Sequence, residues 1–263
     1  MPVPFVIQAP CKHGACNRTK PDPARARKHG LGPALAFGCM LLLLVARPAL
    51  AHDLWLEREG AAFTLYQGHR HSAHAGAEVV PYPAEAVREV MCLDAAGRAS
   101  RPALRLHVPL RIEAACAVLR LSFSTGYWSK TAWETVNRPK SEVAGAIDSW
   151  LAEETIQRIE AWTPAAARAW GDALSLTPLA DPLVLKLGDK LALRVSRAGR
   201  PLAGVAVAYQ GSTRGVTDAE GVIRIRLRQD GVQSIQASVV TPLNDGRADR
   251  RIETATLQFE LSR

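Results

Sequence analysis

The chain has 263 residues and a formal net charge of +8, from 33 Lys and Arg against 25 Asp and Glu. Seven of the basic residues and one acidic residue lie in residues 1–51, so residues 52–263 hold 26 basic and 24 acidic residues, a formal +2. A nucleic-acid-binding domain carries a basic surface on its folded part, and this balance argues against that class.

Residues 1–51 have the composition of a leader with a signal peptide. A basic segment precedes an apolar run over residues 31–46, and Ala49 and Ala51 occupy the small-residue positions that a signal peptidase requires. The run has sixteen residues and contains Pro33, which is short for a membrane span. We therefore predict cleavage after Ala51, a periplasmic mature chain and no stable membrane span after cleavage. An uncleaved membrane anchor is the alternative.

Cleavage after Ala51 makes His52 the first residue of the mature chain. Its α-amino group and its imidazole can chelate one metal ion, because an α-amino pKa of about 8 lets a metal displace the proton at neutral pH. Further along the chain, His69, His71 and His74 fall within six residues. His69 and His71 point the same way on a strand, and His74 can fold back towards them.

Imidazole nitrogens without a thiolate suit divalent Ni, Co, Cu or Zn. We therefore predict a metal site formed by His52, His69, His71 and His74, and whether His52 shares the site with the other three stays open. The alternative is a solvated histidine cluster that titrates at about pH 6.5 and binds no metal.

Two cysteines remain after the leader is removed, Cys92 and Cys116. An even pair in an oxidising compartment predicts a disulfide bond between them. Ligation of Cu(I) by the two thiolates is the alternative, although neither cysteine has a second cysteine at CxxC spacing.

Short alternating or β-branched segments separated by turn signals predict a mainly β structure. We expect two β-sandwich domains, over residues 52–177 and 178–263, the second of them Ig- or transthyretin-like. The clearest strands are His52–Glu57, Ala62–Gln67, Val87–Leu93, Val118–Phe123, Lys190–Val195, Val222–Leu227, Ser234–Val240 and Thr254–Leu261.

Two segments of the first domain depart from this strand pattern. Residues 127–133 hold Tyr127, Trp128 and Trp133, and we expect this aromatic loop to pack on the domain rather than to form a binding platform. Residues 141–162 predict the one α-helix, inserted or bridging between the domains. Its apolar face has helical spacing and consists of Ile147, Trp150, Leu151 and Ile159.

The predicted mature chain begins with His52 and an aromatic-apolar strand. It later carries the motifs Gly-x-Pro-Leu-x-Gly-Val-x-Val from Gly199 and Thr-Asp-x-x-Gly from Thr217. In these features the chain resembles the NikM-like domain-of-unknown-function family. The resemblance covers essentially all of residues 52–263. It implies a periplasmic component of nickel or cobalt uptake with a membrane metal importer as partner, and it implies a metal-binding role for His52.

The sequence carries no GxSxG, HExxH, P-loop or GxGxxG signature. We therefore predict a non-enzymatic metal-binding protein that delivers the metal ion to a membrane importer or acts as a chaperone for the metal ion. One alternative is a copper-dependent oxidative enzyme with an N-terminal histidine site, in which Tyr66 is the axial group. The other is a structural or adhesive β-sandwich without metal.

Overall fold

The structure, a computed structural model, describes residues 53–70, 79–104 and 107–261. Residues 49–263 form one compact unit. The described residues contain three short 3-10 turns and no α-helix, so the prediction of a mainly β protein is confirmed. The strands are β1 (Asp53–Glu59), β2 (Ala62–Gly68), β3 (Val87–Leu93), β4 (Ala99–Ser100), β5 (Arg111–Glu113), β6 (Val118–Lys130), β7 (Thr135–Val136), β8 (Asp148–Ile159), β9 (Leu174–Pro178), β10 (Lys190–Arg197), β11 (Arg200–Pro201), β12 (Ala206–Tyr209), β13 (Ser212–Val216), β14 (Val222–Arg226), β15 (Val232–Pro242) and β16 (Arg250–Glu260).

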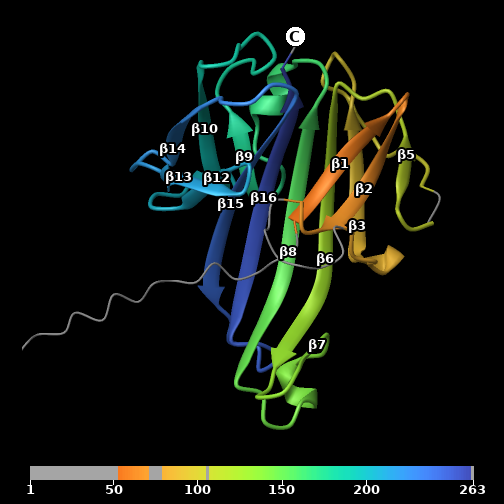
Figure 1. Cartoon of the computed structure of the whole chain (residues 1–263), viewed down its shortest axis with the longest axis vertical. Helices are drawn as coiled ribbons and strands as arrows, with labels where there is room; N and C mark the ends of the chain where they lie inside the picture. The colour runs from red at the N-terminus through yellow and green to blue at the C-terminus, as the bar shows by residue number, and fades with distance from the viewer. Residues whose placement is uncertain (1–52, 71–78, 105–106, 262–263) are drawn as a thin grey trace, which may run out of the picture. The chain divides into compact units, whose positions relative to one another are not determined.

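The strands form one large sheet and two small ones (Figure 1). The large sheet has the order β13-β12-β15-β16-β8-β6-β3-β4, with β7 beside β6. The small sheets are β1-β2-β5 and β11-β10-β14, and β9 also pairs with β10. At the centre of the large sheet, β8 and β16 are parallel and join the two halves of the chain. The large sheet therefore contains strands from both sides of the predicted domain boundary between residues 177 and 178. Whether residues 52–177 and 178–263 fold as separate domains stays a prediction.

The two small sheets cover opposite faces of the large sheet. Neighbouring residues of a strand point to opposite faces, and Val118 lies in one hydrophobic core while Leu119 lies in the other. Leu93 and Cys92 divide in the same way. In Figure 1, β1 and β2 lie in front of β6 and β8, and the backbone N–H of Leu56 on β1 donates to Gln258 Oε1 on β16 at 3.0 Å.

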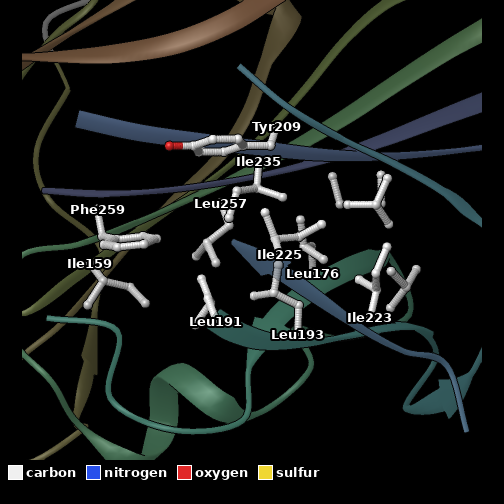
Figure 2. Close-up of a cluster of buried hydrophobic side chains, with 14 of the residues drawn as sticks. Ile159, Leu176, Leu191, Leu193, Tyr209, Ile223, Ile225, Ile235, Leu257 and Phe259 are labelled. Atoms are coloured by element: carbon white, nitrogen blue, oxygen red, sulfur yellow. The ribbon is translucent and has the colours of Figure 1, made fainter. Parts of the chain in front are cut away.

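Each core is built from the inward residues of two facing sheets. The core beneath β1, β2 and β5 includes Leu54, Leu65 and Ile156, each at most 1% exposed. The core between β9, β10 and β14 and the other face of the large sheet is shown in Figure 2, where Tyr209 and Ile235 lie across from Ile225 and Leu193. The central strands are thus buried on both faces along part of their length.

The predicted helix over residues 141–162 is wrong. The segment forms a 3-10 turn at Lys140–Glu142 and then β8, which pairs with β6 on one side and with β16 on the other. Ile156 enters one core and Ile159 enters the other, so burial on both faces removes the alternation that identifies a strand in the sequence. No helix in the described part of the chain is long and apolar enough to cross a membrane.

The predicted disulfide bond between Cys92 and Cys116 is confirmed, with the two Cα atoms 5.2 Å apart. Both cysteines are buried in the core beneath β1, β2 and β5. The bond links β3 to the residues that lead into β6 and closes a loop with a sequence separation of 24.

Replacing both cysteines with alanine should lower the free energy of unfolding by about 3 kcal/mol, because the bond restricts the unfolded chain. Urea unfolding under oxidising conditions measures the difference. The control is the wild-type protein after reduction, which should unfold close to the double variant. Equal midpoints for the oxidised wild type and the double variant would contradict the expectation.

Candidate functional site

One of the four predicted metal ligands lies in the described part of the chain. His69 follows directly after β2, whereas His52, His71 and His74 lie outside the described residues. Among residues 53–70, 79–104 and 107–261, no group of three or more His, Cys, Asp or Glu side chains is placed to hold a metal ion. The surroundings of Asp53, which follows His52, and of Gly68, which precedes His69, are described.

The hairpin of β1 and β2 brings Asp53, which follows His52 in the chain, and Gly68, which precedes His69, to the same end of the sheet. Gly60 has a φ of +62° and forms the turn, a conformation that glycine adopts at low cost. From this turn the antiparallel register runs to the last pair, Asp53 and Gly68. His52 precedes Asp53 in the chain and His69 follows Gly68, so we call this pair the open end of the hairpin.

Two carboxyl groups interact at the open end. Gln236 Nε2 on β15 lies 3.4 Å from Asp53 Oδ1 and donates to it. Burial, the larger cause, and the negative charge of Asp53 together raise the pKa of Glu154 on β8 to about 8. A nearby cation would favour the ionised form of Glu154, so this end of the molecule is electrostatically suited to positive charge.

Tyr66 lies on the outer side of the same hairpin. Its ring stacks on Trp55 with centroids 5.7 Å apart, and its hydroxyl donates to Glu59 at 3.2 Å. Glu59 is next to the turn of the hairpin and pairs with Ala62, so this hydroxyl is directed away from the open end. The contacts of Tyr66 give no support to an axial role in a copper site.

A cleft of about 280 Å³ lies next to the open end, below the hairpin. One side of the cleft is formed by the segment 80–83, and the other side is formed by the strands β6, β7 and β8. Trp150, Ala152 and Glu154 line it from alternate positions of β8, as residues on one face of a strand do. The other lining residues are Gln67, Val80, Pro81, Pro83, Thr125, Trp128, Thr135 and Asn137.

Hydrogen bonds fix the aromatic wall of this cleft. Trp128 and Trp150 are cross-strand partners whose rings are nearly parallel, at an interplanar angle of 10° and a centroid separation of 6.5 Å. Trp128 Nε1 donates to Thr125 Oγ1 at 2.8 Å. Asn137 Nδ2 donates to the carbonyl oxygens of Thr125 and Tyr127, at 2.7 and 2.8 Å. The wall is therefore formed before any ligand arrives.

The aromatic loop divides between packing and exposure. Tyr127 and Trp128 lie on β6 and not in a loop. Trp128 packs on Trp150 and also lines the cleft, and the Arg247 guanidinium lies over the ring of Tyr127 at 4.0 Å. Trp133 is 94% exposed and departs from the expectation of packing.

The sequence does not reveal Glu154 as a site residue, because on the predicted helix over residues 141–162 both Glu153 and Glu154 lie outside the apolar face. On a strand the two side chains point to opposite faces. Glu153 forms an ion pair with Arg251 at 3.2 Å, and Glu154 lines the cleft. Had this segment been predicted as a strand, Glu153 and Glu154 would have been assigned to opposite faces of the sheet.

Neither a protein-family model nor a curated protein matches this sequence. A comparison with solved structures finds the crystal structure of the N-terminal four Ig domains of Dscam1 isoform 6.9, at 13% identity, covering 81% of this chain and 73% of that chain, with a TM-score of 0.20. A TM-score at this level carries no argument about fold or function.

Proposed function

We propose that this protein is exported to the periplasm and binds one divalent transition metal ion at the open end of the hairpin, Ni or Co in the first place and Cu or Zn in the second. The ligands are the imidazoles of His52, His69, His71 and His74, with the α-amino group of His52 as a further donor. Delivery to a membrane importer is the role that the resemblance to the NikM-like family implies.

The observation that carries the proposal is the register of β1 and β2. Asp53 and Gly68 are partners, and His52 and His69 are their outer neighbours in the chain. Consecutive Cα atoms are 3.8 Å apart and antiparallel partners about 5 Å apart, so chain connectivity keeps the two histidine Cα atoms within about 13 Å. Two imidazoles that reach towards each other from this distance can ligate one ion.

Charge and redox chemistry support the same proposal. A divalent cation near Asp53 and Glu154 would offset the repulsion that raises the pKa of Glu154. Carboxylates close to ligand histidines also orient the imidazoles. The disulfide bond of Cys92 with Cys116 is typical of a protein in an oxidising compartment, which is consistent with export.

Native mass spectrometry of the exported protein tests the proposal. The protein is measured without metal and after exposure to Ni, Co, Cu and Zn ions in turn, which gives the mature N-terminus and the stoichiometry together. We expect a chain that starts at His52 and holds one ion. His69→Ala should weaken its affinity at least about 100-fold, because loss of a residue that only orients a ligand already costs about 10- to 100-fold.

The matched control for His69→Ala is His107→Ala. His107 is exposed, lies outside the predicted ligand set, and has its Nδ1 atom 3.1 Å from the carbonyl oxygen of Val108. The control should bind metal as the wild type does. Weak binding of all four ions by the wild type, or an equal loss in both variants, would refute the metal site.

A further inference from the structure

The cleft below the hairpin combines aromatic walls with a single ionisable side chain. Among the described residues that line it, Glu154 is the only one with an ionisable side chain. Its partners in register, Phe123 on β6 and Thr254 on β16, are uncharged. The cleft lining therefore offers one carboxyl group, with the further negative charge of Asp53 acting on it.

The indole rings of Trp128 and Trp150 are the second component. Indole is the aromatic side chain that attracts cations most strongly, because its ring face is electron-rich. Trp150 already has one such contact, since the Arg250 guanidinium lies 5.6 Å from its ring centroid. Asp148 accepts two hydrogen bonds from Arg250 and neutralises its charge, and Arg250 is not part of the cleft lining.

The floor of the cleft is kept open by small residues. Ala152 lies between Trp150 and Glu154 on β8, and its partner on β6 is Gly126. A strand rises about 3.3 Å per residue, so the Cα atoms of Trp150 and Glu154 are about 13 Å apart. A small ligand above Ala152 would contact an indole ring at one end and the carboxylate at the other.

We propose that this cleft binds a small organic cation, a quaternary ammonium compound or a protonated amine, with its charged group between the Glu154 carboxylate and the indole rings of Trp128 and Trp150. The volume of about 280 Å³ suits a ligand at the small end of the usual range. The proposal goes beyond the metal site, and none of the four histidines takes part. Both sites use the negative charge of Glu154, so binding to the cleft is measured without added metal.

Choline and benzyltrimethylammonium are suitable probes, because their positive charge is permanent and two sizes are covered. Binding to the mature full-length protein without added metal is followed at about pH 9, where the Glu154 carboxyl group is ionised, by tryptophan fluorescence and by calorimetry. We expect saturable binding of each cation at one site. Dimethylbutanol, the uncharged isostere of choline, should bind at least about tenfold more weakly than choline, which corresponds to about 1.4 kcal/mol from recognition of the charge.

Three variants locate the site. Glu154→Gln should weaken choline binding at least about tenfold, and Ala152→Phe should abolish it by filling the floor. The matched control is Glu153→Gln, one residue away on the opposite face of β8, which should bind as the wild type does. His69→Ala should also bind choline normally, so that failure of the metal site and failure of this site are distinguishable.

Several results would overturn the proposal. These are no saturation by either cation in the millimolar range, equal affinity for choline and dimethylbutanol, or a Glu154→Gln variant that binds choline like the wild type. Saturable binding of uncharged monosaccharides in place of the cations would also overturn it and would assign the tryptophan wall to carbohydrate recognition. Folding of each variant is checked by near-ultraviolet circular dichroism before titration.

Discussion

Arg158→Ala is expected to lower the free energy of unfolding by about 3–5 kcal/mol, the usual loss when one member of a buried charged network is removed. The side chain of Arg158 on β8 is 1% exposed. Its Nε atom donates to Glu160 at 2.6 Å, and its Nη2 atom lies 3.5 Å from a carboxylate oxygen of Glu260 at the end of β16. Glu160 also forms an ion pair with Arg58 on β1, so the network joins the small sheet to the large one.

Urea unfolding of the wild type and the variant measures this difference. Arg158→Met should lower the free energy of unfolding less than Arg158→Ala, because methionine fills much of the same space without a charge. The control is Arg98→Ala, which removes an exposed ion pair with Asp94 at 2.7 Å and should cost less than about 1 kcal/mol. An Arg158→Ala variant no less stable than Arg98→Ala would refute the importance of the network.

Glu154→Gln is expected to remove a pH-dependent loss of stability. The pKa of Glu154 is raised to about 8 by burial and by Asp53, whereas an unfolded glutamate has its ordinary value of 4.5. Between these two values the folded protein binds a proton that the unfolded chain releases, so stability falls as the pH rises from about 5 to 8. The loss at about pH 8 is at most about 4 kcal/mol, from 1.36 kcal/mol for each pKa unit.

Free energies of unfolding at about pH 5 and about pH 8 test this prediction. The variant and the wild type should be close at the lower pH, and the variant should be the more stable of the two at the higher pH. Glu253 also has a pKa raised by burial and adds a change of the same sign, so the informative quantity is the difference between variant and wild type. A Glu153→Gln control should keep the wild-type pH dependence, and an equal fall in all three proteins would contradict the assignment.

The strands that expose one face to solvent could be predicted from the sequence. In β14, buried Ile223 and Ile225 alternate with exposed Arg224 and Arg226. β8 could not be predicted, because Ala152, Glu153 and Glu154 have good helix propensity and burial on both faces removes the period of two. Tertiary contacts with β6 and β16 override the local preference of this segment.

The candidate sites depend on pairings between distant strands. The histidine-rich stretches are visible in the sequence, but only the structure shows that Asp53, next to His52 in the chain, pairs with Gly68, next to His69. The cleft depends on the partnership of Trp128 with Trp150 across β6 and β8. Alternation identifies strands and their faces, but it does not identify which strands become neighbours.

The parallel pairing of β8 with β16 has a consequence for the order in which the chain acquires its structure. β16 consists of residues 250–260 and lies between β15 and β8, so the large sheet is interrupted until nearly the whole chain is present. Pairings over such sequence separations form slowly, because the long loop must be closed before the contacts stabilise it. A nascent chain without its last strand therefore leaves the edges of β8 and β15 unpaired, and the two halves of the large sheet join only when synthesis is nearly complete.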